Sequence, residues 1–345
     1  MIKNDPITST QVESFSNILS KTNIAEAGIG DYQLTYLKHL FFHKNYYLRI
    51  YVQVLNEVLS KSDKAKKDIF LIDYGAGNGL LGLFAKYCGF GNVVQVDTSE
   101  GFHASQKILS EKLNIQITAH LMGDFETLKK YTQEAPDALV GTDVIEHVYD
   151  LDAFFSTLHE LNPNMTIVFT TASNDRNPWK KKRLMRVQRK DELEGYDAEN
   201  GNESLLPFRQ VRENIIKNKL PQLHQKDLDS LVTNSRGMRQ DDIIKACERY
   251  STTKIIPPLP AHPTNTCDPL SGSWTERFLS FEEYKNIFNR HGYTLSIKNG
   301  FYNQYQGGVK GTILFFLNIL GKIPGRAGNM ISPYIMLTGS GIKKK

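Results

Sequence analysis

Between about residues 68 and 173, short apolar runs alternate with longer amphipathic segments. Runs of four to six aliphatic residues bounded by polar residues or glycine predict buried strands, and the longer segments predict helices. In order, starting with a strand and alternating with helices, the expected elements lie at 69–74, 80–87, 93–97, 101–112, 115–121, 125–131, 138–141, 144–161 and 166–171. Five strands separated by helices predict a parallel, doubly wound α/β sheet. Ligands bind such sheets at the carboxyl ends of the strands.

The residues before this core predict two helices, at 11–19 and 32–59. Leucines and aromatic residues recur at helical spacing in the second, so it has an apolar face for the core. Its tyrosines and histidines can reach a substrate pocket or serve packing and surface only: Tyr36, His39, His43, Tyr46 and Tyr47.

After the fifth strand the alternation ends, and residues 174–256 are polar and basic, with helical pieces near 208–218, 226–233 and 239–250. The following segment, 256–269, contains five prolines, which remove backbone donors and exclude a helix, so it predicts an ordered loop or lid.

Beyond the loop the pattern predicts a helix at 280–291, a strand at 294–302, a packed helix at 312–320 and a last strand at 334–338. Ser280 and Glu283 form a capping-box pattern at the first of these helices. The expected division is an N-terminal helical segment (1–66), a core (67–173), an inserted helical cap (174–256), and a substrate loop with the end of the core (257–345).

Composition sets the class of protein. The chain has 345 residues, 40% hydrophobic and 23% charged, with a net charge of +5, which suits a globular protein. Part of that charge lies in local runs at 180–183 and 343–345, and runs of this kind are usually solvated, so nucleic acid is not an expected partner. Three widely spaced cysteines indicate neither disulfides nor a zinc site. No signal peptide or membrane span is evident, and the expected location is the cytoplasm.

The segment Asp73 to Gly79, DYGAGNG, follows the first strand. Glycines at alternate positions let the backbone turn tightly against a ligand before a helix begins. A dinucleotide fingerprint requires GxGxxG, but Leu80 stands where that pattern would continue. An acid two residues before GxGxG resembles motif I of the class I S-adenosylmethionine (SAM) methyltransferases. The resemblance implies that SAM is bound by Asp73, Gly75, Ala76, Gly77, Asn78 and Gly79, with Asp73 accepting from its ammonium group. The alternative for Asp73 is a turn cap.

The next two strand ends fit the same ligand. Asp97 ends VVQVD about 20 residues past the glycines, where the acid that binds ribose hydroxyls belongs, and Thr98 follows it. After the third strand, Gly123, Asp124 and Phe125 resemble the adenine contact of the family. Asp124 is alternatively a plain helix N-cap.

At the fourth strand, DVIEHV resembles the [DE]xxEHV segment of the ubiquinone-biosynthesis O-methyltransferase group. The similarity covers about residues 68–172 and 275–302. It implies that Thr142, Asp143 and Val144 lie beside the methyl donor, on a seven-stranded sheet whose last strand is antiparallel. Asp143 with Glu146 is alternatively a capping box. In that group, the glutamate and histidine that correspond to Glu146 and His147 can hold a divalent cation. Here the first acid of the segment is Asp143 and not glutamate, and no second ExxEH-like segment supplies further ligands, so a metal is not favoured.

Methyl transfer depends mainly on alignment of the acceptor, and a hydroxyl acceptor also needs a base. His147 is the first candidate; His262 with Asp268, in the lid loop, is the second, and a surface role is the alternative for His262. Trp274 and Arg277, before the penultimate helix, are expected to contact substrate, together with Tyr36 and His43. Arg277 could pair with an anionic acceptor or brace the loop.

The sequence thus predicts a SAM-dependent methyltransferase that releases S-adenosylhomocysteine and acts on a hydroxyl of a small molecule, glycan or lipid-linked acceptor. Alternatives are N-methylation, metal-assisted RNA 2′-O-methylation, and SAM binding without turnover. The 312–320 segment, bracketed by Lys310 and Lys322, is alternatively a patch that touches a membrane. Neither the acceptor nor the oligomeric state can be read from the sequence.

Overall fold

The computed structural model describes residues 5–25, 28–131, 134–197, 204–323 and 325–341. The chain forms two compact units. The first, which we call the sheet unit, comprises Met1–Ile145, Leu151–Thr171 and Phe281–Lys345. The second, the helical unit, comprises Glu146–Asp150 and Ala172–Ser280. The basic run predicted at 343–345 lies outside the described residues.

A seven-stranded sheet organises the sheet unit, with strand order β3-β2-β1-β4-β5-β9-β8. The strands are β1 (Phe70–Tyr74), β2 (Asn92–Asp97), β3 (Ala119–Met122), β4 (Ala138–Thr142), β5 (Thr166–Thr171), β8 (Tyr293–Asn299) and β9 (Ile335–Gly341). Neighbouring strands from β3 to β5 are parallel, while β9 runs antiparallel to both β5 and β8. The predicted doubly wound fold with an antiparallel last strand is confirmed.

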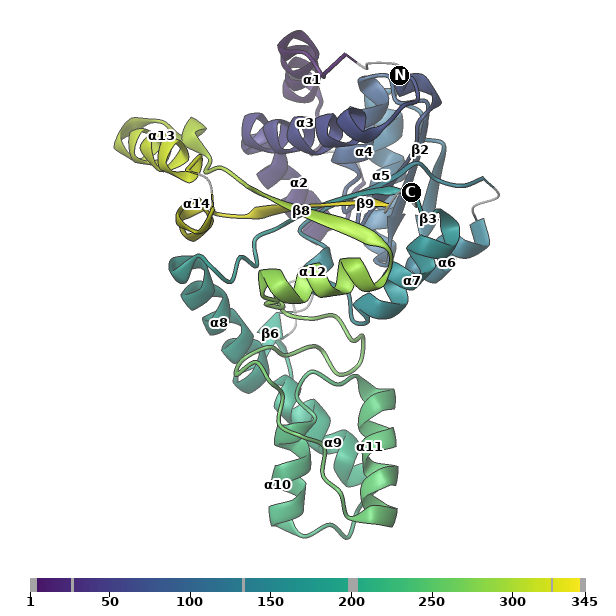
Figure 1. Cartoon of the computed structure of the whole chain (residues 1–345), viewed down its shortest axis with the longest axis vertical. Helices are drawn as coiled ribbons and strands as arrows, with labels where there is room; N and C mark the ends of the chain where they lie inside the picture. The colour runs from purple at the N-terminus through teal and green to yellow at the C-terminus, as the bar shows by residue number, and fades with distance from the viewer. Residues whose placement is uncertain (1–4, 26–27, 132–133, 198–203, 324, 342–345) are drawn as a thin grey trace. The chain divides into compact units, whose positions relative to one another are not determined.

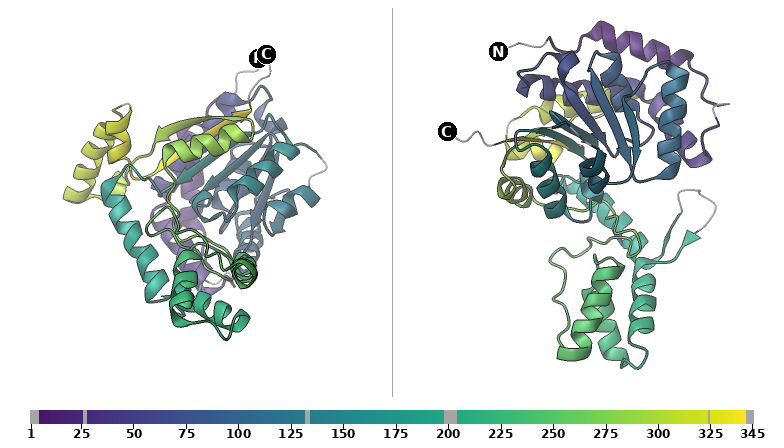
Figure 2. Two further views of the ribbon diagram at one scale, coloured as in Figure 1. Left: turned by 60° about the horizontal axis from the view of Figure 1, so that its bottom comes forward. Right: turned by 90° about the vertical axis from the view of Figure 1, so that its right-hand side faces the viewer.

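Two layers of helices cover this sheet (Figures 1 and 2). On one side are α3 (Lys44–Lys61), α4 (Leu80–Tyr87) and α5 (Glu100–Leu113), joined by α1 (Ser9–Lys21) and α2 (Asp31–Phe42). On the other are α6 (Phe125–Tyr131), α7 (Leu151–Leu161) and α12 (Phe281–Arg290). The all-buried strands β1 and β5 carry apolar side chains toward both layers, as expected of central parallel strands.

The structure corrects three predicted helices. The helix expected at 32–59 is two helices that break at His43, whose φ and ψ are −103° and 22°. The helix expected from Val144 is only a 3₁₀ turn, η2 (Ile145–His147), and α7 begins at Leu151. Asp143 has a φ of +50°, whereas N-cap residues adopt extended backbone, so the capping-box interpretation of Asp143 and Glu146 is wrong.

The third correction concerns the C-terminal helix, α13, which spans Gly308–Gly321 and is followed by α14 (Arg326–Ile331). It is not the packed helix that was predicted, because its buried residues are only Gly311 and Gly321. Strand β3 is also shorter than expected, and β8 ends at Asn299. No described helix combines the length and apolar character that crossing a bilayer requires.

The helical unit contains α8 (Pro178–Leu193), the short strands β6 (Tyr196–Asp197) and β7 (Ser204–Leu205), then α9 (Phe208–Lys219), α10 (Gln225–Asn234) and α11 (Gln240–Thr253). Its own apolar core joins the last three helices through Ile216, Leu228, Leu231, Val232 and Ile243. The proline-rich stretch after α11 contains neither helix nor strand, as its prolines predict.

Candidate functional site

The glycine turn after β1 requires glycine for steric reasons. Gly75, Gly77 and Gly79 have φ values of +65°, +53° and +82°. A Cβ atom at Gly75 would lie 2.3 Å from Cγ2 of Val144, which packs directly on the turn from the end of β4. The turn is therefore a bare backbone surface in contact with the neighbouring strand end, which suits close approach of a ligand.

Asp97 at the end of β2 holds this turn. Its Oδ2 accepts a hydrogen bond from the Gly77 amide at 2.8 Å, and its Oδ1 accepts from the Ser99 amide at 2.9 Å. Both carboxylate oxygens are thereby oriented beside the glycine backbone, while Thr98 is exposed. A carboxylate fixed at this strand end fits the ribose of a nucleoside ligand.

Asn78 and Gln95 support the turn from inside. Asn78 is buried, its Nδ2 donates to the carbonyl oxygen of Gln33, and Ser105 Oγ donates to its Oδ1. This places Asn78 in a network that ties α2 and α5 to the turn. Gln95, fully buried, donates from Nε2 to the Gly79 carbonyl oxygen at 2.6 Å. The sequence prediction missed Gln95, although a lone amide within the apolar strand VVQVD was a usable signal.

Asp73 is 2% exposed, and its Oδ2 accepts from the Gly82 amide at 2.8 Å. Burial, together with the charge of Asp97 and against the opposing effect of the Gly82 hydrogen bond, raises the pKa of this carboxyl to about 7. The turn-capping role is therefore present in the structure. The contact with the ammonium group of SAM stays a prediction.

The pKa of Asp73 predicts a pH-dependent stability. Its folded value of about 7 exceeds the value of about 3.9 in an unfolded chain, so the folded state holds this proton more tightly. Asp73 should therefore lower the free energy of unfolding as the pH rises from 4 to 7, by up to about 4 kcal/mol. Asp73→Asn keeps an acceptor for Gly82 and removes the titration, so chemical denaturation across this range should show a flatter profile. The exposed Asp68→Asn is the control, and a constant offset between parent and Asp73→Asn would contradict the assignment.

At the end of β3, Asp124 acts as the N-cap of α6, which is the alternative role considered for it. Its Oδ1 accepts from the Glu126 amide at 2.9 Å, and its carbonyl oxygen accepts from the Thr127 amide, so Asp124 starts α6. Phe125 packs edge-on against Phe154 of α7. The adenine contact of Gly123, Asp124 and Phe125 stays a prediction, which this capping role does not exclude.

At the end of β4, the half-buried Thr142 precedes Asp143, whose amide donates to the Thr170 carbonyl oxygen at 2.9 Å. Tyrosines of α3 lie within electrostatic reach of the Asp143 carboxylate. Burial, with the charge of Asp143, raises the pKa of Tyr47 to about 12. Burial raises the pKa of Tyr51 well above its ordinary value, and Tyr36 and Asp73 add to that effect. These phenols stay protonated at neutral pH and can donate hydrogen bonds at this strand end. Tyr51 is 4% exposed and belongs to the apolar core, as its helical spacing predicts.

Of the two substrate residues predicted in the N-terminal helices, Tyr36 is 41% exposed and lies next to the turn, 3.7 Å from the Cβ position of Gly77. His43 accepts at Nδ1 from the Asn303 amide at 3.2 Å. Burial lowers the pKa of His43, as do the nearby His39 and Lys310, so its ring is neutral. Tyr36 thus lies at the glycine turn, whereas His43 is engaged with the loop after β8.

In the helical unit, backbone and ring contacts join the segment Glu146–Asp150 to Trp274 and Arg277. The Trp274 and Arg277 amides donate to the carbonyl oxygens of His147 and Glu146, at 3.3 and 3.2 Å. The Trp274 indole donates to the Tyr149 carbonyl oxygen at 3.1 Å and stacks on the Tyr149 ring. The Arg277 guanidinium lies 4.3 Å from the Trp274 ring centre. The structure thus brings His147, Trp274 and Arg277 together.

These contacts fix the orientation of the His147 ring. Its Nδ1 lies 2.7 Å from the Trp274 carbonyl oxygen, which can only accept, so Nδ1 carries the proton. In the neutral ring, Nε2 is then the basic nitrogen. The arrangement prepares His147 to accept a proton at Nε2.

His262 and Asp268 instead organise their loop. Nδ1 of His262 accepts from the Thr264 and Asn265 amides at 3.3 and 3.1 Å, so its neutral ring carries the proton on Nε2. Asp268 accepts from the Leu270 amide and from Ser271 Oγ, at 2.9 and 2.7 Å. Their catalytic role stays a prediction without a structural observation that favours it.

Glu146 is buried, at 1% exposure. Over the described part of the chain, no three or more histidine, cysteine, aspartate or glutamate side chains form a group that could hold a metal ion. Glu146 and His147 are therefore not accompanied there by further ligands of these types.

One comparison with known proteins gives a family match. Residues 42–212 match the family model described as a methyltransferase domain. A search of curated proteins gives no match. The sequence group of ubiquinone-biosynthesis O-methyltransferases is not among these findings, so that finer resemblance stays a prediction.

Solved structures with a similar chain path have low sequence identity. Magnesium protoporphyrin IX methyltransferase from Synechocystis PCC 6803, with bound SAH, is 11% identical with a TM-score of 0.39, over 97% of this chain and 95% of that one. A SAM-dependent methyltransferase from Mesorhizobium loti is 14% identical with a TM-score of 0.38, over 83% and 96%. Phosphoethanolamine N-methyltransferase 2 from Haemonchus contortus, in complex with SAM, is 12% identical with a TM-score of 0.41, over 97% and 58%. The family match includes β1 to β5 of the sheet and supports a methyltransferase domain in this part of the chain.

Proposed function

We propose that this protein transfers the methyl group of SAM to a hydroxyl group of a small molecule, a glycan or a lipid-linked acceptor. The observation that carries the choice of a hydroxyl is the His147 ring, whose Nδ1 is bound to the Trp274 carbonyl oxygen and whose Nε2 is left as the basic nitrogen. A hydroxyl must lose its proton as it is methylated, and a positioned imidazole is suited to take it.

The residues of the glycine turn fit SAM as the donor. Gly75, Ala76 and Gly77 would receive its amino acid part on bare backbone, Asp73 would face its ammonium group, and Asp97 would bind the ribose hydroxyls. When bound, SAM supplies an electrophilic methyl group. The buried acid Asp73 carries a pKa near 7, which a cation would lower by favouring the ionised form.

The acceptor would be held and deprotonated by residues beside His147. Trp274 presents an indole that is stacked and hydrogen-bonded in place, so it offers a rigid wall. Arg277, above that indole, supplies a positive charge for an anionic acceptor. Nε2 of His147 would accept the hydroxyl proton, and the imidazolium would then be stabilised through Nδ1 by the Trp274 carbonyl oxygen.

A panel of acceptors tests this proposal. The full chain is incubated with SAM and separate sets of phenols, sugars, lipid-linked sugars, amines and RNA, and SAH release and the methylated atom are measured by mass spectrometry. Methylation of a hydroxyl compound supports the proposal. Methylation confined to amines, or SAM binding with no product from any set, would contradict it.

One observation favours RNA as a second candidate acceptor. Helix α8 carries exposed basic side chains at Lys182, Arg183, Arg186, Arg189 and Lys190. Binding of RNA through such a row would weaken steeply with salt. RNA affinity that is weak at low salt would remove this candidate.

A further inference from the structure

Helix α13 exposes most of its large apolar side chains. Within GVKGTILFFLNILG the polar residues are only Lys310, Thr312 and Asn318. Seven apolar residues in or next to the helix are at least 43% exposed: Val309, Ile313, Phe315, Phe316, Ile319, Leu320 and Ile323. In Figures 1 and 2, α13 lies beyond the C-terminal end of β8, outside the helical layers that cover the sheet.

The face of α13 that contacts the rest of the sheet unit carries Gly311, Asn318 and Gly321, beside the half-buried Leu314 and Leu317. The Asn318 amide donates to the Tyr302 carbonyl oxygen and to Gln304 Oε1, and its Oδ1 accepts from the Tyr302 amide at 2.6 Å. Gly311 and Gly321 are buried. This is the reverse of an ordinary surface helix, which turns its apolar side inward. The polar anchor holds the apolar side chains outward, where water makes their exposure unfavourable.

The described sequence around this helix is basic. Among the described residues from 284 to 341 there are six lysines and arginines and no aspartate or glutamate. A cavity of about 600 Å³ adjoins α13 and is lined by its Asn318 and Gly321 together with Lys322, Lys298 and Arg49.

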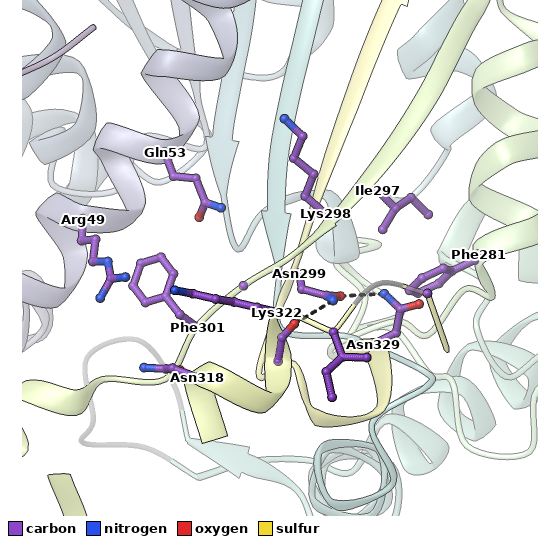
Figure 3. Close-up of a pocket in the computed structure, with 14 residues that line it drawn as sticks. Arg49, Gln53, Phe281, Ile297, Lys298, Asn299, Phe301, Asn318, Lys322 and Asn329 are labelled. Atoms are coloured by element: carbon purple, nitrogen blue, oxygen red, sulfur yellow. Dashed lines mark hydrogen bonds between the residues drawn. The ribbon is translucent and has the colours of Figure 1, made fainter. Parts of the chain in front are cut away.

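Figure 3 shows how this cavity is built. Asn299 joins its wall to α13 and α14, because its Nδ2 donates to the Gly321 carbonyl oxygen and its Oδ1 accepts from Asn329, at 3.0 and 2.6 Å. The Arg49 guanidinium lies 4.3 Å from the Phe301 ring centre. Lys298 pairs with Glu57 at 2.5 Å. The cavity therefore presents amides and the cations of Arg49 and Lys322 next to the apolar helix, while Glu57 offsets the charge of Lys298.

We propose that α13 lies in the surface of a membrane that contains anionic phospholipids, with Phe315, Phe316 and their neighbours in the acyl boundary and the cationic cavity facing the headgroups. The helix is about 21 Å long, shorter than the roughly 30 Å of a bilayer core, so it lies in the interface and does not cross. An apolar helix with lysines at its edges is the ordinary form of such a surface.

Charge favours a membrane over a second copy of this chain as the occupant. In a symmetric dimer through α13, Lys310, Lys322 and Arg326 of one copy would face the same cations of the other, with no acid from residue 284 onward to offset them. An anionic lipid surface complements these cations. The proposal does not depend on methyl transfer, because membrane binding can be measured without an acceptor.

Vesicle flotation tests the proposal with the full chain. We expect the protein to float with vesicles in which about a third of the phosphatidylcholine is replaced by phosphatidylglycerol, and to bind vesicles of phosphatidylcholine alone at least about fivefold more weakly. The double variant Ile313→Ser/Phe316→Ser should lose more than about tenfold in affinity, since two apolar side chains no longer enter the boundary. Lys310→Glu should lose about fivefold on the anionic vesicles only.

Leu259→Ser, at a 68% exposed leucine of the helical unit, is the matched control and should float as the parent does. Circular dichroism and the melting temperature establish that each variant is folded. A parent that stays at the bottom with both vesicle types would overturn the proposal, as would equal losses in the control and the double variant. Self-association in sedimentation velocity that the double variant abolishes, without any vesicle binding, would assign the surface to a second copy and also overturn it.

Discussion

Replacing His147 with alanine should lower turnover by about a hundredfold or more, while the affinity for SAM changes by less than about threefold. The reason is the fixed orientation of its ring: Nδ1 is held by the Trp274 carbonyl oxygen, so Nε2 alone is available to take a proton. Alanine removes this base, and His147 carries the one imidazole of the Trp274 cluster formed by His147, Tyr149, Trp274 and Arg277. Turnover is measured as SAH release with the hydroxyl acceptor found in the panel, and SAM affinity by calorimetry.

His224→Ala is the matched control, because His224 is an exposed histidine of the helical unit whose side chain caps no helix. It should leave both quantities as in the parent. His262→Ala is informative too. The His262 ring accepts hydrogen bonds from two backbone amides, so we expect this variant to lose thermal stability but to lose less turnover than His147→Ala. Equal losses of turnover and SAM affinity in His147→Ala would assign this histidine to the cofactor site and contradict the proposed role.

Replacing Asp97 with alanine should weaken SAM binding by about a hundredfold or more. The carboxylate holds the Gly77 and Ser99 amides and is the proposed partner of the ribose hydroxyls, and hydrogen bonds to a charged group contribute about 1.5–3 kcal/mol each. Asp97→Asn retains an oxygen for the Gly77 amide, so its loss should be smaller, about tenfold. The exposed acid Asp68→Ala is the control and should bind SAM as the parent does.

A thermodynamic cycle with two ligands and two proteins separates the two roles of Asp97, which are holding the Gly77 and Ser99 amides and binding the ribose hydroxyls. In the parent, 2′-deoxy-SAH should bind more weakly than SAH, because one hydroxyl that the carboxylate accepts is missing. In Asp97→Asn the two ligands should bind with more similar affinities. If the difference between the ligands were the same in both proteins, Asp97 would serve the loop alone, and the ribose assignment would be wrong.

Sequence reasoning predicted the glycine turn because its determinants are local. An aliphatic strand, glycines at 75, 77 and 79, and an apolar helix occupy fewer than twenty consecutive residues, so their spacing alone specifies the strand, turn and helix. The same holds for the acid at the end of β2. The alternation of strands and helices extends this local information to the order of the whole sheet.

Other features depend on residues far apart in the chain. Asp143 adopts a left-handed backbone and Glu146–Asp150 packs against Trp274 and Arg277, more than 120 residues later. A capping-box pattern cannot reveal such contacts, which is why a longer helix was predicted there. Similarly, the mostly apolar 312–320 segment has no periodicity that shows which side is exposed, and the outcome depends on Asn318 and the buried glycines.

The account rests on SAM as the ligand of the glycine turn, and calorimetry of the full chain with SAM and with SAH tests it most directly. We predict binding of one molecule per chain with a dissociation constant on the order of micromolar for both ligands, and loss of that heat in Asp97→Ala. Absence of binding in the folded parent at millimolar SAM, or unchanged binding in Asp97→Ala, would contradict the central claim.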